Sequence, residues 1–248
     1  LLTSVFSLLP WAGAGRIIGG REAEPHSRPY MAYVQISHRL GTACCGGFLI
    51  RSDAVLSAAH CVAGKENVKI NVTLGAHNIK RKEQSQQVFR IKDGNWVRHP
   101  NYSRVTREND IMLLKLEPKA KLTKEVAVVP LASLKTPEKP GTTCSVSGWG
   151  WTSLKKRRTN VLMEVDLTVQ SYSVCEHVFK KFKEKSMICV GDNSGRKSTY
   201  KGDSGGPLVC SGKAHGIVSY GRKKRLFPKV FTRISYFYSW VWKELRKL

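Results

Sequence analysis

The sequence predicts an all-β fold that ends in a single helix. Short apolar runs recur along the 248 residues, and Gly, Pro, Asn and Ser separate them at intervals typical of a β-sandwich or β-barrel. Helical periodicity appears only in the last segment, SYFYSWVWKELRKL, where Tyr236, Trp240 and Leu245 can share one face. A chain of this length can bury one large core or two modest ones.

Each expected strand is a short apolar run between turn-forming residues. The first half of the chain holds such runs at 29–36, 44–50, 54–59, 67–76 and 111–116. The second half holds them at 144–150, 161–169, 207–210, 214–220 and 230–234. Residues 116–134, LEPKAKLTKEVAVVPLASL, are the best candidate for a crossing between two halves.

The first residues indicate export. Residues 1–15 carry no charge, are too short to span a bilayer comfortably, and contain Ala12-Gly13-Ala14, which is typical of a cleavage site. We therefore expect residues 1–14 to be a signal peptide, and we expect no transmembrane segment after it. Asn71 and Asn101 each begin an Asn-x-Ser/Thr pattern, so both are candidate glycosylation acceptors. The seven cysteines agree with an oxidising compartment, and their odd number leaves at least one thiol unpaired or paired between chains.

The charge is strongly positive. Forty-two Lys and Arg residues and eighteen Asp and Glu residues give a formal net charge of +24 at pH 7. One basic cluster alone would be a solvated loop, but together the clusters favour a polyanionic partner: sulfated glycosaminoglycan, nucleic acid or an anionic membrane. Aromatic residues do not interleave with them as in nucleic-acid-binding motifs, so no specific nucleic acid is expected. The clusters lie at 80–82, 155–158, 180–185, 222–225 and 243–247.

The stretch GDSGGP at 202–207 places a carboxylate beside a hydroxyl on a glycine-rich segment. This composition also suits a plain turn, because glycine tolerates positive φ and Asp and Ser bond their own backbone. Three further motifs favour a nucleophile at Ser204: SAAHC supplies His60, NDIMLLKL supplies Asp110, and IIGG follows the basic residue Arg16. A serine hydroxyl needs a base to take its proton, and a neutral imidazole can do so near pH 7.

In their order and flanking residues, His60, Asp110 and Ser204 resemble the chymotrypsin-like serine endopeptidases, and the resemblance runs from Ile17 to the C-terminus. The resemblance implies two six-stranded antiparallel β-barrels with the catalytic groups in the cleft between them. The N-terminal barrel would comprise 17–128, and the C-terminal barrel with the terminal helix would comprise 129–248.

The resemblance also implies a role for each residue of the site. His60 would be the general base rather than a satisfied core histidine, and Asp110 would fix its tautomer and stabilise the imidazolium. The amides of Gly202 and Ser204 would bind the oxyanion of the tetrahedral intermediate.

Asp203 lies beside the nucleophile, and a buried carboxylate is costly unless it is paired. In the resembled family its partner is an α-amino group freed by cleavage, here that of Ile17, whereas the alternative is that Asp203 only caps a turn. IIGG after AGA-GR is similar to the leukocyte and mast-cell branch: granzymes such as granzyme B, chymases and cathepsin G. This implies that the dipeptide Gly15-Arg16 is trimmed, and that the protein is secreted or stored in secretory granules of leukocytes or mast cells.

By flanking motif, the resemblance pairs Cys45 with Cys61, Cys144 with Cys210, and Cys175 with Cys189. Cys44 is left over, for packing or for an intermolecular bond. No zinc spacing is present, and the segment GAHNIKRKEQSQQ is mostly basic and amide where calcium would need carboxylate and carbonyl oxygens, so we expect no metal and no cofactor.

The resemblance places a primary pocket for P1, the residue on the amino side of the cleaved bond. Ser198 would form its floor, and the absence of an acid there argues against cleavage after Lys or Arg. Lys229 at the back would favour a P1 Asp or Glu, although an ammonium cannot hold a carboxylate in bidentate fashion. If Lys229 instead extended to water, the pocket would be hydrophobic and chymase-like. The remaining pocket residues are Ser219, Tyr220 and Gly221 in the walls, with Lys201 and Arg222 at the rim.

We therefore expect a secreted or granule-stored serine endopeptidase that hydrolyses peptide bonds through an acyl-enzyme on Ser204. The expected partners are protein or peptide substrates, a sulfated glycosaminoglycan or proteoglycan, and serpin-type inhibitors. The rival hypothesis is a catalytically silent, polyanion-binding defence protein, but such relatives lose residues of the triad, and all three stand here.

Overall fold

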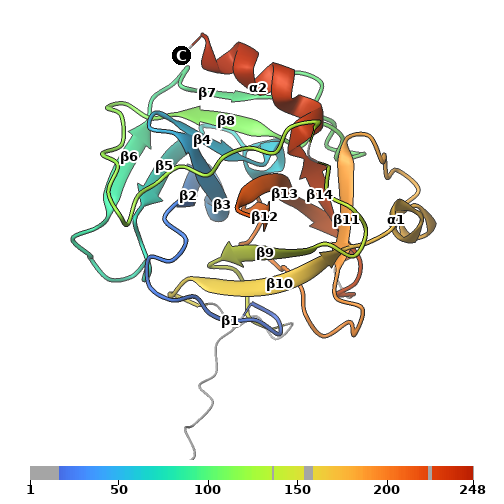
Figure 1. The fold of residues 1–248 in the computed structure, drawn as a ribbon. Coiled ribbons are helices and arrows are strands. Elements are labelled where there is room, and N and C mark those ends of the chain that lie inside the picture. Colours follow the sequence, from blue (N-terminus) through green and yellow to red (C-terminus); the bar gives the residue numbers. More distant parts are fainter. Residues whose placement is uncertain (1–16, 136, 154–158, 223–224, 248) are drawn as a thin grey trace, which may run out of the picture.

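The computed structural model describes residues 17–135, 137–153, 159–222 and 225–247. The predicted signal peptide, the dipeptide at 15–16 and the basic run at 155–158 lie outside these ranges, as does the middle of the run at 222–225. The described chain forms two antiparallel sheets, and each is built almost wholly from one half of the sequence (Figure 1). The all-β fold with two sheets and a C-terminal helix is confirmed.

The N-terminal sheet alternates buried apolar and more exposed residues along its strands. In β2, for example, Val34 and Ile36 are fully buried and Gln35 between them is exposed, so one face of the strand covers the core. The strand order is β6-β5-β2-β3-β4-β8-β7. The bounds are β2 (Met31–His38), β3 (Gly41–Arg51), β4 (Ala54–Ser57), β5 (Lys69–Leu74), β6 (Gln87–Ile91), β7 (Trp96–Arg98) and β8 (Met112–Lys115).

The C-terminal sheet closes on itself. Its order is β1-β10-β11-β14-β13-β12-β9, and an additional pairing of β9 with β10 makes a closed ring of six strands. The short strand β1 (Arg21–Glu22) pairs with β10 outside this ring. The ring strands are β9 (Thr143–Gly148), β10 (Met163–Val169), β11 (Met187–Gly191), β12 (Pro207–Cys210), β13 (Lys213–Gly221) and β14 (Lys229–Arg233).

The six-stranded ring of the C-terminal half agrees with the barrel that the resemblance implied, and each sheet has seven strands among the described residues when the short additional strands are included. The additional C-terminal strand is β1, which is only two residues long and comes from the other half of the sequence. The N-terminal sheet includes the three-residue β7, which was not predicted because it contains no apolar run. Strands this short carry too few residues for an alternation pattern to reveal them.

The C-terminal helix was predicted, and its buried face was predicted in part, because Leu245 is buried and Trp240 packs partly buried against the core. A 3-10 turn (Ile234–Phe237) precedes α2 (Tyr238–Leu245) and changes the angular spacing of the side chains. The buried positions are therefore Phe237, Val241 and Leu245, whereas Tyr236 is 52% exposed. A second helix, α1 (Tyr172–Val178), is too short to have shown a periodic pattern.

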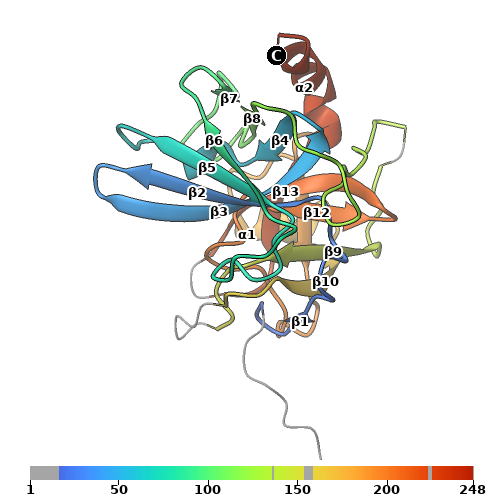
Figure 2. The ribbon, with the colours of Figure 1, turned by 90° about the vertical axis from the view of Figure 1, so that its left-hand side faces the viewer.

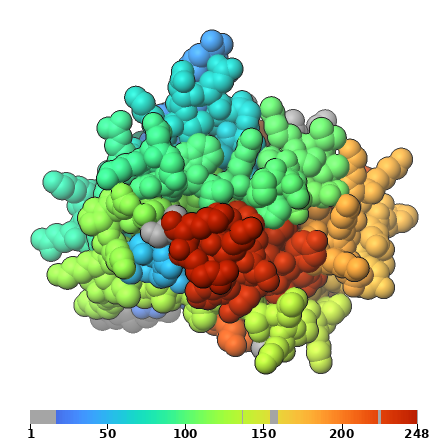
Figure 3. Space-filling view, turned by 90° about the horizontal axis from the view of Figure 1, so that it is seen from above, coloured from blue at the N-terminus to red at the C-terminus, as the bar shows by residue number. Residues whose placement is uncertain are grey.

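Both ends of the described chain pack against the opposite half. The buried residues of α2 join the core of the N-terminal sheet, and Figure 3 shows the helix on the surface among segments of the first half. The N-terminal β1 runs along β10 of the C-terminal sheet (Figures 1 and 2). The predicted boundary between residues 128 and 129 falls in the long connection from β8 to β9. Because each terminal segment packs against the other half of the same chain, the two segments hold the two halves together.

The three disulfides are Cys45–Cys61, Cys144–Cys210 and Cys175–Cys189, the same pairs that the resemblance implied. Cys44 keeps a free thiol and accepts a hydrogen bond from the Tyr33 hydroxyl at 2.9 Å. The two predicted glycosylation acceptors differ in setting: Asn101 is exposed in a loop, and Asn71 is half-buried in β5.

Candidate active site

Two neighbouring strands bring His60 and Asp110 together. β4 and β8 pair so that Ser57, the last residue of β4, lies opposite Met112, the first residue of β8. His60 follows β4 in a short 3-10 turn (Ala59–Cys61), and Asp110 directly precedes the apolar residues that lead into β8. His60 Nδ1 lies 2.8 Å from Asp110 Oδ2, and the His60 amide donates to Asp110 Oδ1 at 2.8 Å.

Asp110 is completely buried, and residues of the C-terminal sheet complete its surroundings. The Ser219 hydroxyl donates to its carboxylate, and the Thr232 hydroxyl donates to its main-chain carbonyl at 2.8 Å. Burial by itself would raise the pKa of Asp110, but the charge of His60 and the hydrogen bonds from His60 and Ser219 hold that pKa below its usual value. An ionised Asp110 favours the tautomer with the proton on His60 Nδ1, which leaves Nε2 free to accept a proton.

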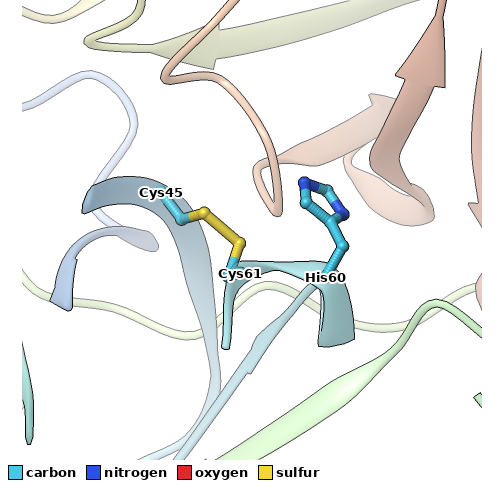
Figure 4. Close-up of side chains that lie close together, drawn as sticks. All are labelled: Cys45, His60 and Cys61. Atoms are coloured by element: carbon cyan, nitrogen blue, oxygen red, sulfur yellow. A yellow bond between two sulfur atoms is a disulfide. The ribbon is translucent and has the colours of Figure 1, made fainter. Parts of the chain in front are cut away.

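A disulfide anchors the turn that carries His60. Cys61 is bonded to Cys45 of β3, and Figure 4 shows this bond beside the imidazole ring. The two sulfurs and the ring nitrogens lie close enough together for a metal site. Because both sulfurs are bonded to each other, they offer no thiolate to a metal, and the bond ties the turn that contains His60 to β3.

Ser204 lies on a turn that only glycine permits at two positions. Gly202 and Gly205 have φ of +101° and +84°. A Cβ on Gly205 would overlap the Ser57 hydroxyl and the Gly46 carbonyl, so the turn fits closely against the N-terminal half. The Gly46 amide donates to the Ser204 carbonyl at 2.7 Å, which holds the backbone while the side chain lines the same cavity as His60.

The two amides predicted for the oxyanion hole have no acceptor within the part of the chain that the structure describes. The amide between them behaves differently, because Asp203 N donates to the Tyr200 carbonyl at 3.1 Å. The donors of Gly202 and Ser204 are therefore available to an external oxygen beside the Ser204 side chain.

The Asp203 carboxylate is fully buried on the other side of this turn. Its Oδ1 accepts from the Gly150 amide at 2.9 Å, and its Oδ2 accepts from the Tyr200 amide at 2.8 Å. Burial outweighs these bonds and raises the pKa of Asp203 to about 7. The side chain of Ile17 is also fully buried, in the core of the C-terminal sheet.

One cavity of about 250 Å³ contains most of the predicted site residues. At its buried end lies Lys229, which is 6% exposed, with Nζ 5.6 Å from the centre of the Tyr200 ring. Burial lowers the pKa of Lys229 to about 8, partly opposed by the charge of Asp203. The alternative in which Lys229 extends to water is wrong for this structure. The lining residues are His60, Arg107, Thr199, Tyr200, Lys201, Ser204, Val218, Ser219, Tyr220, Gly221, Arg222 and Lys229.

Two residues depart from the predicted pocket. Ser198 was expected at the floor, but it is 1% exposed, donates to the Leu226 carbonyl at 2.8 Å, and does not line the cavity. The neighbouring Thr199 lines it instead. Arg107 lines the cavity although no motif pointed to it. The sequence feature that could have indicated Arg107 was its position three residues before Asp110.

The chain is similar to known proteins along nearly its whole length. The sequence model of the family described as Trypsin matches residues 17–241. Human cathepsin G is 49% identical over 246 residues, covering 99% of this chain and 94% of the relative. Human granzyme B is 49% identical over 248 residues, covering 100% and 98%. A solved structure titled "Structure of GrC" superposes with a TM-score of 0.87 at 45% identity, covering 93% of this chain and 100% of that one. Among the described residues, no helix is both long enough and apolar enough to cross a membrane.

Proposed function

Because this chain belongs to the trypsin family of serine proteases, we propose that Ser204, His60 and Asp110 are the residues that carry out its peptide hydrolysis. The chain is a serine endopeptidase, and it acts on protein substrates. The observation that supports the assignment is the 2.8 Å contact between His60 Nδ1 and the buried Asp110 carboxylate, beside a cavity that also contains Ser204.

In the proposed reaction, the Ser204 oxygen attacks the scissile carbonyl carbon while His60 Nε2 takes the hydroxyl proton. The carbonyl oxygen gains the negative charge and accepts hydrogen bonds from the free amides of Gly202 and Ser204. The C–N bond then breaks, and the amine leaves with the proton from His60. Water, deprotonated by His60, hydrolyses the resulting ester and regenerates the Ser204 hydroxyl.

Activation would follow cleavage between Arg16 and Ile17. The freed ammonium of Ile17 would pair with Asp203. Within the part of the chain that the structure describes, the buried Asp203 carboxylate accepts hydrogen bonds from the Gly150 and Tyr200 amides, and both donors are neutral. A pKa raised to about 7 indicates how unfavourable the unpaired charge is. Because Asp203 and the oxyanion amides share one turn, this ion pair would set the geometry of those amides.

We propose Asp or Glu as the preferred P1 residue. Lys229 supports this preference because it lies at the buried end of the cavity and is held there rather than in water. Lys201 and Arg222 at the rim add charge of the same sign. Among the described residues that line the cavity there is no Asp or Glu, so the interior is suited to an anionic side chain.

The high positive charge supports a sulfated glycosaminoglycan as a partner, and the names of the relatives support export with storage in secretory granules of leukocytes or mast cells. Serpin-type inhibitors would act on the same site. Binding of the protein to a heparin column should depend strongly on salt concentration. Elution from that column at low salt would argue against the polyanion partner.

A fluorophosphonate probe tests the assigned nucleophile. After removal of residues 1–16, the chain should form one adduct, on Ser204, and Ser204→Ala should form none. A chain that forms no adduct at Ser204 would support the catalytically silent, polyanion-binding alternative. A peptide library varied at P1 tests the pocket: a preference for Phe and Leu over Asp and Glu, unchanged in Lys229→Gly, would favour the hydrophobic alternative.

A further inference from the structure

Arg107 lines the same cavity as Lys229. This residue lies in the loop between β7 and β8, three residues before Asp110, and it lines the cavity together with His60 and Ser204. It is half-buried, so its guanidinium is neither packed in the core nor fully in solvent. Its position next to the residues of the reaction makes it a candidate to contact the substrate.

The loop holds Arg107 in a fixed conformation. Its φ is +60°, and its amide donates to the Ser103 carbonyl at 2.8 Å. The Ser103 amide donates in turn to the Glu108 carbonyl at 3.1 Å, which closes the loop. The guanidinium donates one hydrogen bond, from Nη1 to the Tyr102 hydroxyl at 3.3 Å. A planar guanidinium has five N–H donors, so most remain available.

The charge of Arg107 is not neutralised locally. Within the described residues no carboxylate forms an ion pair with it, and the adjacent Glu108 pairs with Lys183 at 3.0 Å. Two of its charged neighbours, Lys65 and Arg104, have the same sign, and burial together with repulsion by Arg104 and Arg107 lowers the pKa of Lys65. The nearby carboxylate of Asp110 is buried and bonded to His60 and Ser219. The positive charge of Arg107 beside the cavity would therefore favour an anion supplied from outside.

We infer that Arg107 is a specificity-determining residue that binds a second acidic side chain of the substrate, one, two or three residues before P1. The inference rests on the proposed function, because it takes the P1 side chain to enter the cavity towards Lys229. The scissile carbonyl then lies at Ser204, and the preceding residues of the peptide pass His60 towards Arg107. The preferred substrates are therefore peptides with two acids, one for Lys229 and one for Arg107. Among the described residues, the charged side chains that line this cavity, apart from His60, are all Lys or Arg.

The experiment uses the trimmed enzyme and peptides with Asp at P1. In one peptide of each pair, a Glu stands at one of the three preceding positions, and the other peptide has Gln there. The readout is the ratio of kcat/KM for Glu over Gln. We expect a ratio of about ten or more at one position, because hydrogen bonds to charged groups are the strong ones. In Arg107→Gln the ratio should fall to about one, and Arg107→Lys should keep part of it.

The matched control is Arg90→Gln, which removes the same charge from an exposed position on β6 and should leave the ratio unchanged. Rates are normalised to active sites titrated with fluorophosphonate, so a misfolded fraction cannot imitate the effect. A ratio near one at all three positions in the wild-type enzyme would overturn the inference while the proposed function stood. If P1 Asp is not cleaved but P1 Phe is, the same pairs are measured with P1 Phe, and a ratio near one again overturns it. Loss of labelling at Ser204 would instead remove the proposed function, and the inference with it.

Discussion

The hydroxyl of Thr232, in β14 of the C-terminal sheet, donates a 2.8 Å hydrogen bond to the main-chain carbonyl of Asp110 in the N-terminal half. Both groups are buried. The position of the carboxylate that contacts His60 is therefore fixed from both halves of the molecule, and a change in one half can disturb chemistry in the other.

Thr232→Val should test this link, because it keeps the shape of the side chain and removes the donor. The Asp110 carbonyl loses a buried partner, which typically costs about 1–3 kcal/mol of stability. We expect a lower free energy of unfolding by urea denaturation, and a lower kcat with little change in KM. Thr168→Val, in a half-exposed position on β10, is the control. An unchanged kcat in Thr232→Val would contradict the proposed positioning.

The Cys45–Cys61 disulfide should matter more for activity than its stability contribution explains. Removing it by a double Cys→Ala substitution frees the turn that carries His60. Removing Cys175–Cys189 opens a loop of similar length, with 14 instead of 16 residues of separation, so both changes should cost a similar ~3 kcal/mol. We expect kcat to fall at least about tenfold further in the first variant. Equal losses of kcat would show that the bond does not position His60.

The pKa of Lys229 predicts how the P1 preference depends on pH. Burial lowers this pKa to about 8, so the side chain carries its charge below that value and loses it as pH rises through it. The kcat/KM ratio of P1 Asp over P1 Asn should therefore decrease above about pH 8. Lys229→Arg should remove this decrease, because a guanidinium does not titrate in that range. If this kcat/KM ratio stays constant up to pH 9 in the wild-type enzyme, the charge of Lys229 does not determine the preference for an acidic P1 residue.

The buried Asp203 predicts how stability depends on pH before and after trimming. Its pKa is raised to about 7 from an ordinary value of about 4. The folded uncut chain therefore binds the proton more tightly than the unfolded chain, and its stability should fall as pH rises from about 4 to about 7. The freed Ile17 ammonium would stabilise the carboxylate, so the trimmed chain should lose less. Tm measured at pH 5 and 7.5 in a Ser204→Ala background compares the two forms.

Asp203→Asn should remove the difference between trimmed and uncut chains in that experiment. Parallel pH profiles of the trimmed and uncut forms, both with Asp203 intact, would mean that no ion pair forms after cleavage.

Much of the fold could be predicted because alternating apolar runs and turn-forming residues carry local information. The ten expected strands all appear, whereas β1, β6, β7, β11 and α1 were missed. β1 and β7 are very short, and α1 spans only two turns. Tyr236 was wrongly expected on the buried face because it lies in the 3-10 turn before α2, and a 3.6-residue period does not describe such a turn.

The site shows the same division between local and long-range information. The motifs around His60, Asp110 and Ser204 are contiguous, so they could be recognised in the sequence alone. The inward turn of Ser198, whose hydroxyl is taken by the Leu226 carbonyl, depends on a contact between distant segments. The entry of Arg107 into the cavity depends on the closed loop before Asp110. The position of Ser198 could not be derived without the three-dimensional arrangement, and the nearness of Arg107 to Asp110 in the sequence was only a partial signal.

The central claim is that Ser204, activated by His60, forms the acyl-enzyme. The most direct measurement is the pre-steady-state reaction of the trimmed enzyme with a p-nitrophenyl ester, followed by mass-spectrometric mapping of the acyl group. The account predicts a burst of one p-nitrophenol per active site, an acyl group on Ser204, and no burst in Ser204→Ala or His60→Ala. A burst that persists in Ser204→Ala, or an acyl group on another residue, would contradict it.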